Sequence, residues 1–146
     1  MVGGRDAAYR LRVAAGFLAE MRQDAELSRW RSAVDNAQLA VENAAKAVLA
    51  LLGPVGRTHN PAVQLRQALG DGLLPMALRG HVTRLSELAE TLGFDIHVQT
   101  DYGDEMGGRT PWELFDEADA RQAQALAEEA VLVAGSVISA LTDQTS

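Results

Sequence analysis

The amino-acid sequence predicts an all-α protein, an up-and-down bundle of four main helices plus a short fifth one. Apolar residues recur at steps of three and four over long stretches, as on the buried face of a helix. All four prolines fall at the ends of these stretches. With 146 residues the chain is long enough to bury a core of its own, so we expect one domain spanning residues 1–146.

The first two helices are expected at residues 6–24 and 25–52. In the first, the apolar stripe consists of Ala7, Leu11, Ala14, Phe17, Leu18 and Met21. Four arginines make this helix basic: Arg5, Arg10, Arg12 and Arg22. The second helix is rich in alanine, the best helix former, and Gly53-Pro54 ends it because proline cannot continue the hydrogen-bond ladder.

Two further helices follow a short loop. The third is short, at residues 61–69, and begins with Asn60 as its N-cap and Pro61 in the first helical position. The glycines around Asp71 break it. The fourth helix is expected at residues 75–92, where leucines keep helical spacing until a glycine ends the run.

Residues 94–109 form the least regular stretch of the chain. Phe94, Ile96 and Val98 alternate with polar residues as in a short strand, but no other segment offers a strand partner. We therefore expect an extended segment or an irregular helix there. The loop expected at residues 101–108 is long, which is typical of functional loops.

The last helix has two candidate starts. Thr110 and Glu113 fit a capping box that includes a proline in the first helical position. Asp116 with Asp119 three residues later offers a second start. From there we expect the helix to run to about residue 141, with alanine and valine on its inner face.

The charge of the chain is unevenly distributed. Residues 1–92 hold 11 basic and 9 acidic residues, a balance of +2, whereas residues 93–146 hold 2 basic and 11 acidic residues, a balance of −9. Together they give the net charge of −7. An acidic chain lacks the electrostatic footprint of a nucleic-acid-binding protein, so binding to nucleic acid is disfavoured. The basic first helix and the acidic last third are expected to attract each other, within the bundle or across an interface.

Nothing in the sequence predicts contact with a membrane. The N-terminal residues lack the apolar run of a signal peptide. The longest nearly apolar stretch, residues 44–55, is interrupted by Lys46, Gly53 and Pro54 and is too short to span a bilayer. There are no cysteines, hence no disulfide framework. We expect a soluble, cytoplasmic protein.

The common catalytic and cofactor motifs are missing from the sequence. It contains no phosphate-binding loop, dinucleotide glycine pattern, zinc-protease motif or nucleophile elbow. The three histidines, His59, His81 and His97, lie far apart, and none has a second ligand at metal-binding spacing. We therefore expect no metal and no cofactor, and we assign no catalytic residue.

Two segments nevertheless hold candidate binding residues. Arg57 and His59 lie just before a predicted helix N-terminus, where they could bind an anion or, through His59, serve as a general base. Alternatively this turn only caps the helix, which is the commoner role. In the acidic loop, Asp101 and Asp104 could offer oxygens to a hard cation, or simply keep the loop hydrated.

Two pairs of motifs resemble the HEPN family. The first is an alanine-rich helix of the pattern AQ-x-A-x-E-x-x-x-KA, which here contains Gln38, Glu42 and Lys46, followed by the turn Gly56-Arg57-Thr58-His59-Asn60-Pro61. The second is the tyrosine-containing acidic loop Asp101-Tyr102-Gly103-Asp104, followed by the helix start Phe115-Asp116-Glu117-Ala118-Asp119-Ala120. In their order and spacing these motifs cover most of the chain.

The resemblance implies a HEPN-like bundle of four or five helices that usually dimerises. HEPN proteins include RNA-cleaving toxins, partners of small nucleotidyltransferases, and nucleotide-binding modules. The nuclease branch carries an arginine followed, after four to six residues, by a histidine. The nine positions that would have to supply this arginine hold other residues: Leu52, Gly53, Pro54, Leu74, Pro75, Met76, Glu90, Thr91 and Leu92.

We therefore expect a non-catalytic or regulatory homodimer, the partner of a nucleotidyltransferase in a toxin–antitoxin-type pair. One alternative is a ribonuclease toxin with a site built from Arg57, His59 and Tyr102 across the dimer. Another is a nucleotide-binding module in which Lys46, Arg57 and His59 face phosphates. The candidate ligand-binding residues are accordingly Lys46, Arg57, His59, Asp101, Tyr102 and Asp104.

Overall fold

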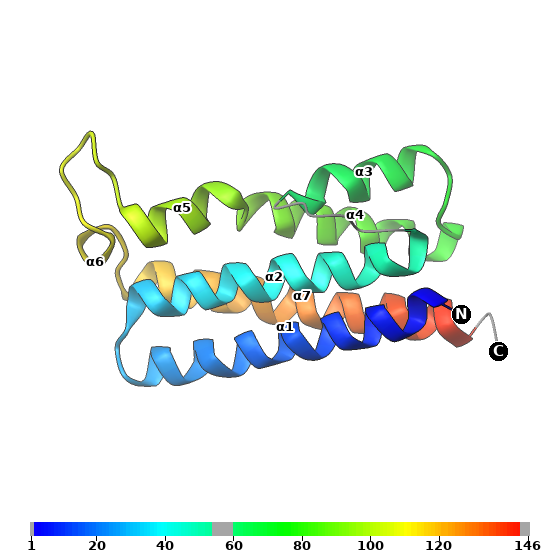
Figure 1. Ribbon diagram of the computed structural model, residues 1–146, viewed down its shortest axis with the longest axis horizontal. Coiled ribbons are helices and arrows are strands. Elements are labelled where there is room, and N and C mark those ends of the chain that lie inside the picture. Colours follow the sequence, from blue (N-terminus) through cyan, green and yellow to red (C-terminus); the bar gives the residue numbers. More distant parts are fainter. Residues whose placement is uncertain (1, 54–59, 144–146) are drawn as a thin grey trace.

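The computed structural model describes residues 2–53 and 60–143, and these form seven helices (Figure 1). The all-α prediction is confirmed. In the described part of the chain, β-type pairing is limited to one isolated bridge, between Asp104 and Arg109. The helices are α1 (Val2–Glu26), α2 (Trp30–Leu52), α3 (Pro61–Gly70), α4 (Met76–Thr91), α5 (Phe94–Tyr102), α6 (Pro111–Leu114) and α7 (Glu117–Asp143).

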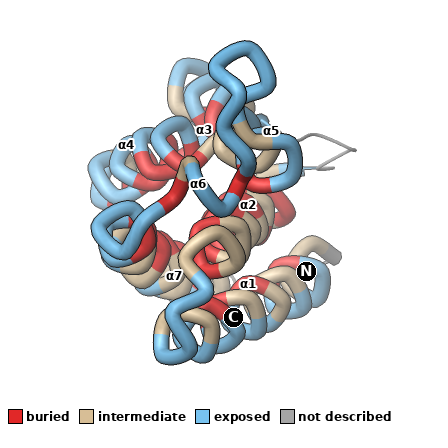
Figure 2. Tube along the Cα trace, turned by 90° about the vertical axis from the view of Figure 1, so that its left-hand side faces the viewer, coloured by how far each residue is buried: buried red, intermediate tan, exposed pale blue. Residues whose placement is uncertain are grey.

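Helix α2 forms the centre of the bundle. It contacts each of the other six helices, and α1 and α7 pack along most of its length. Its buried face consists largely of alanines, which allow neighbouring helices to approach closely. A Cβ added to Gly3 of α1 would overlap the carbonyl oxygen of Ala50, so the two helices touch backbone to backbone there. Figure 2 shows the buried positions gathered where α2 faces its neighbours.

The turn between the first two helices lies later in the chain than predicted. Helix α1 runs from Val2 to Glu26 instead of residues 6–24, and α2 begins at Trp30 instead of residue 25. The break contains neither glycine nor proline, and the chain reverses with Ser28 at a φ of 58°. An ordinary serine in the left-handed region gives no signal that sequence patterns can detect. The ends of α3 and α4 lie within one residue of prediction.

Residues 94–102 form an α-helix, so of the two expectations for this stretch the extended segment is wrong and the helical alternative is the one that the structure contains. Helix α5 lies on the outside of the bundle and fully buries only Thr100. Because most of its side chains remain partly in water, its apolar residues need not share one face. This explains why Phe94, Ile96 and Val98 alternate with polar residues although the backbone is helical.

Both predicted starts of the last helix are present, and each begins a helix of its own. The hydroxyl of Thr110 accepts a hydrogen bond from the Glu113 N–H, and the Glu113 carboxylate accepts one from the Thr110 N–H, which starts α6. After an extended Phe115, Asp116 and Asp119 each accept a hydrogen bond from the other's backbone N–H and so start α7. The expected single helix is thus divided in two.

Among the described helices, α7 is the one long and apolar enough to cross a bilayer by length and composition. This is weak evidence, because the core helix of a soluble protein has the same properties. Helix α7 packs against α1, α2 and α4. Its most apolar stretch is only 28% buried within the chain, so an apolar face of α7 remains uncovered.

Candidate functional site

A buried polar row runs along α2. Gln38, Glu42 and Lys46 follow at four-residue intervals and so share one face of the helix. The Gln38 amide donates to the Glu42 carboxylate at 3.4 Å, and the Lys46 ammonium donates to its other oxygen at 3.3 Å. Glu42 is only 8% exposed. Lys46 therefore neutralises a carboxylate inside the bundle. Glu42 and Lys46 are also the glutamate and lysine of the AQ-x-A-x-E-x-x-x-KA pattern.

A second polar cluster joins α5 to α2 near the start of α2. The His97 ring lies between two carboxylates, with Nδ1 3.5 Å from Asp35 Oδ1 and Nε2 3.8 Å from Asp101 Oδ2. The buried Thr100 hydroxyl lies 2.7 Å from the His97 carbonyl oxygen and 3.1 Å from Asp35 Oδ1, and can donate to one of them at a time. These contacts fix the position of α5 on the bundle.

Arg31 connects this cluster to α6. Its guanidinium donates to the Thr100 carbonyl oxygen at 2.9 Å and to the Ser32 hydroxyl at 3.1 Å. The same guanidinium lies over the Trp112 ring, 5.7 Å from the ring centre. Because Arg31 touches both α5 and α6, one side chain of α2 holds the two outer helices in place.

The acidic loop after α5 is closed on itself. Asp104 and Arg109 exchange two backbone hydrogen bonds, and Asp104 Oδ1 also accepts a hydrogen bond from the Gly107 N–H at 3.0 Å. The Asp104 carboxylate is thus part of a turn. Tyr102 and Met106 project into solvent.

The structure brings only some of the predicted site residues together. Asp101, Tyr102 and Asp104 lie close in the chain at the end of α5. Lys46 is 11 residues along α2 from Asp35, which corresponds to about 16 Å at the rise of an α-helix, so it does not share a site with them. Arg57 and His59 lie outside the described residues. Among the described residues, no group of three or more histidines and carboxylates could hold a metal ion.

Sequence reasoning missed Arg31, Asp35, His97, Thr100 and Trp112 as parts of one cluster. A signal for two of its members was present, since His97 and Asp101 are four residues apart and share a face if the segment is helical. In an extended segment the two residues would share a face but lie about 13 Å apart, too far for their side chains to share a site.

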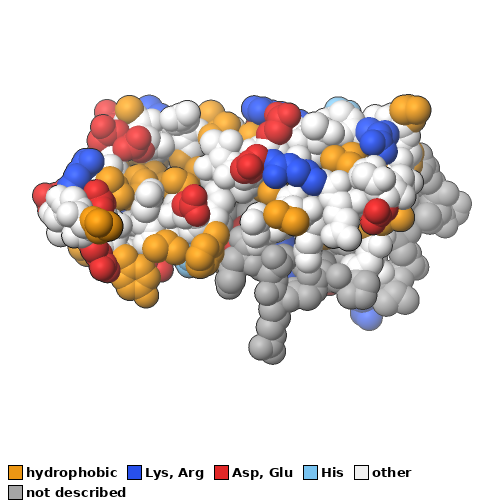
Figure 3. Space-filling model, turned by 90° about the horizontal axis from the view of Figure 1, so that it is seen from above, with side chains coloured by type: hydrophobic (Ala, Val, Ile, Leu, Met, Phe, Trp, Pro, Cys, Tyr) orange, Lys and Arg blue, Asp and Glu red, His pale blue; other side chains and the backbone are white. Residues whose placement is uncertain are grey.

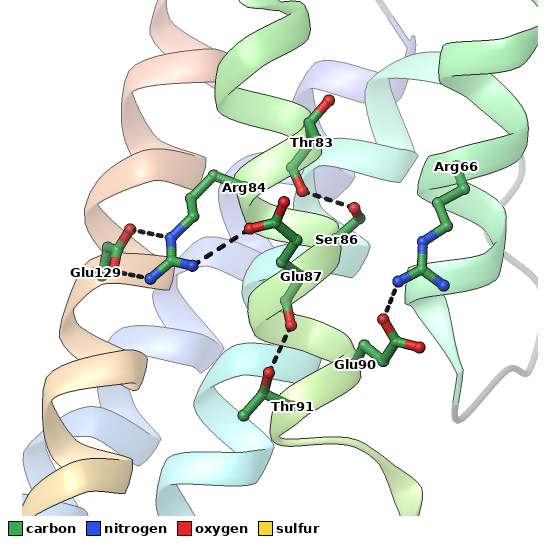
Figure 4. Close-up of polar contacts among 8 residues, drawn as sticks. All are labelled: Arg66, Thr83, Arg84, Ser86, Glu87, Glu90, Thr91 and Glu129. Atoms are coloured by element: carbon green, nitrogen blue, oxygen red, sulfur yellow. Dashed lines mark hydrogen bonds and ion pairs between the residues drawn. The ribbon is translucent and has the colours of Figure 1, made fainter.

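Ion pairs tie the outer helices to one another. Arg84 of α4 makes two hydrogen bonds to Glu129 of α7 and one to Glu87 of its own helix (Figure 4). These hydrogen bonds from Arg84 lower the pKa of the Glu129 carboxyl. Arg22 of α1 lies 3.3 Å from Glu128 of α7, so the basic first helix and the acidic last third do pair within the bundle.

Apolar and acidic side chains lie side by side, with some basic ones among them, over the end of the molecule formed by α5 and the loop after it (Figure 3). We call this region the acidic aromatic surface and define it by the exposed residues Phe94, Asp95, Asp101, Tyr102, Glu105 and Met106. Tyr102 is 65% exposed and Met106 is fully exposed. Covering the Tyr102 and Met106 side chains would remove apolar area from water at little cost in hydration. Exposed apolar side chains of this kind are common on protein-binding surfaces.

Comparison with known proteins gives a family and a fold. Residues 7–142 match a family model described as HEPN domain. The solved structure of TT1696 from Thermus thermophilus is similar over 93% of this chain and 98% of its own, with a TM-score of 0.66 and 21% sequence identity. At that identity the likeness concerns the fold alone. A search of curated proteins found no match.

Proposed function

We propose that this chain, which belongs to the HEPN domain family, is a non-catalytic regulatory protein that acts by binding a nucleotidyltransferase-type protein. In this proposal the two form a toxin–antitoxin-type pair, and the chain takes part as a homodimer. The acidic aromatic surface is the observation that carries the proposal.

That surface has the composition expected of a docking site for a basic partner. Its three apolar side chains would supply the area removed from water, and its three carboxylates would attract and orient the partner. None of those carboxylates pairs with an arginine or lysine in the described part of the chain. A basic partner surface would therefore meet unneutralised negative charge around exposed aromatic rings.

The outer face of α7 supports the homodimer. Residues 130–142 contain no charged side chain, and Leu132 is 72% exposed. A shallow hollow of about 640 Å³ lies along this face, lined by Val131, Leu132, Gly135, Ser136, Ser139, Ala140 and Asp143. A two-fold axis brings a patch against its own copy, so a patch with a single charged residue, Asp143, keeps contacts between like charges few. Small residues allow the two helices to approach closely.

Co-expression with each nucleotidyltransferase-type protein of the same organism tests the partner. We expect one complex to survive size-exclusion chromatography, and Met106→Lys to weaken it at least about tenfold, because the added cation faces a basic partner. Met76→Lys is the matched control, since Met76 is also exposed but lies at the start of α4. If no such protein binds, or if both variants bind alike, the partner proposal is wrong.

Light scattering of the purified chain tests the dimer. We expect a dimer in the wild type and a monomer for Leu132→Glu, because the two substituted side chains would place like charges in the interface. Leu73→Glu changes another exposed leucine outside α7 and should leave the dimer intact. A wild type that remains a monomer at all concentrations would contradict the proposal.

The absence of catalysis is tested with RNA. Because no histidine follows an arginine at the nuclease spacing, wild type and His59→Ala should both leave RNA uncut. Cleavage that depends on His59 would favour the ribonuclease alternative instead.

The nucleotide-binding alternative loses one of its three cations, because Lys46 is held by Glu42. An unchanged melting temperature in excess ATP would argue against that alternative, since a ligand of the native state stabilises it.

A further inference from the structure

A cavity of about 430 Å³ lies between the start of α2 and α6, apart from the two surfaces described above. Its volume falls in the range of small-molecule sites. The lining consists of two arginines, three aromatic residues and two serines: Ser28, Arg29, Trp30, Arg31, Ser32, Trp112 and Phe115. In a chain with a net charge of −7, this lining contains two cations and no carboxylate.

Neither arginine of the cavity is neutralised by a described carboxylate. Within the described part of the chain, Arg29 makes no ion pair, and Arg31 bonds only to a carbonyl oxygen and a hydroxyl. Arg31 Nε is buried and has no acceptor among the described residues. Two arginines that line one cavity without a carboxylate attract an anion that can accept several hydrogen bonds at once.

The start of α2 adds to this positive potential. The helix has 23 residues, and its N-cap, Arg29, offers no side-chain acceptor to the first N–H groups. The N-terminus of a long helix carries partial positive charge and attracts anions. Here that end opens beside the two arginines, so all three contributions act on the same volume.

The remaining walls of the cavity are aromatic. Trp112 is 73% exposed although one guanidinium already lies over its ring, and Phe115 is buried at the same place. An exposed tryptophan ring offers a surface on which a flat ring can stack. An anion without a ring would leave the face of Trp112 exposed to water, whereas an aromatic anion would contact both the arginines and the tryptophan ring.

We propose that this cavity binds a small organic anion in which a phosphate or carboxylate is attached to an aromatic ring. The anionic group lies against Arg29, Arg31 and the start of α2, and the ring stacks on Trp112. The Arg31 contacts to Thr100 and Trp112 hold the site open from the α5 and α6 sides. This inference does not depend on the protein partner proposed above.

Tryptophan fluorescence of the full-length protein tests the proposal, because both tryptophans of the chain line the cavity. The probes are phenyl phosphate and benzoate, with inorganic phosphate and phenol as probes that each lack one part. We expect a saturable change with an aromatic anion, at a Kd about tenfold or more below those of inorganic phosphate and phenol. The tighter of phenyl phosphate and benzoate identifies the anionic group.

Two variants locate the binding. Arg29→Gln and Arg31→Gln should each raise the Kd about tenfold, the loss of one charge-assisted hydrogen bond. Arg12→Gln changes an exposed arginine on α1 and should leave the Kd unchanged. If Arg31→Gln melts early, Arg29→Gln decides the question, because Arg29 is exposed and makes no side-chain hydrogen bond or ion pair in the described residues. The proposal is overturned if neither aromatic anion gives a saturable change, if inorganic phosphate binds as tightly, or if Arg29→Gln binds like the wild type.

Discussion

Glu42 and Lys46 form an ion pair at a place where both side chains are largely withdrawn from water. Removing the cation leaves a buried carboxylate with less to offset its loss of hydration. Lys46→Met should therefore lower the free energy of unfolding by about 3 kcal/mol in urea titrations. Glu42→Gln combined with Lys46→Met should recover part of the loss.

The exposed pair between Arg10 and Asp6 serves as the comparison. Arg10→Met should cost no more than about 0.5 kcal/mol, as is usual for surface ion pairs on a helix. Equal losses for Lys46→Met and Arg10→Met would show that the α2 pair is hydrated after all.

Thr100 is the one fully buried residue of α5, and its hydroxyl reaches both His97 and Asp35. Thr100→Val keeps the shape of the side chain and removes that hydrogen bond, so we expect a loss of about 1–2 kcal/mol in the free energy of unfolding. Thr91→Val also removes a hydroxyl bonded to a carbonyl oxygen, but on an exposed part of α4. It should change the unfolding free energy by less than about 0.5 kcal/mol.

At the scale of the element, the loop after α5 depends on the shape of its backbone. Gly103 and Gly108 have nearly the same positive φ, 71° and 70°. A Cβ added at Gly103 would overlap the Arg109 carbonyl oxygen, whereas one added at Gly108 would meet open space. Gly103→Ala and Gly108→Ala therefore introduce the same backbone strain, but only Gly103→Ala also introduces a clash with the Arg109 carbonyl oxygen.

Gly108→Ala should cost about 1 kcal/mol in unfolding free energy, the strain of an alanine in the left-handed region. Gly103→Ala should cost at least about 1 kcal/mol more, because the chain must also move away from Arg109. Chemical denaturation measures both. Equal losses would mean that the loop adjusts without resistance and does not fix the position of α6.

Elements with explicit start and stop residues could be predicted, and those without them could not. Pro61 and the capping residues Thr110 and Asp116 each mark a helix start that the structure contains. The turn at Ser28 has no such residue, and α5 has no apolar stripe because it buries little. The same error hid part of the site, since His97 and Asp101 become neighbours only on a helix.

At the scale of the whole molecule, the acidic last third is used in two ways. Some carboxylates stabilise the bundle, such as Glu129, which accepts hydrogen bonds from Arg84 of α4. Others, on the acidic aromatic surface, meet no arginine or lysine in the described part of the chain. The charge imbalance was visible in the sequence, but its division between these roles was not, because it depends on which helices become neighbours in three dimensions.

Acid should therefore destabilise the bundle through a few identifiable carboxylates. Hydrogen bonds lower the pKa of Glu129 through Arg84, of Glu113 through the Thr110 hydroxyl, and of Asp116 through the Asp119 N–H. A carboxyl whose pKa is lowered by folding stabilises the native state fully above its unfolded pKa, and this contribution is lost as the pH falls through the folded value. The ordinary values are 4.5 for the two glutamates and 3.8 for Asp116.

We accordingly expect these carboxylates to contribute the same unfolding free energy at pH 7 and pH 6, and progressively less below about pH 4.5. Glu129→Gln should lower stability at pH 7 and make the decline in acid less steep, because the variant has no proton to take up at that position. Glu20→Gln is the control, since Glu20 makes no side-chain hydrogen bond or ion pair in the described residues. Urea titrations over this pH range measure both slopes. A Glu129→Gln protein whose stability falls as steeply as that of the wild type would show that the ion pair to α4 does not stabilise the bundle.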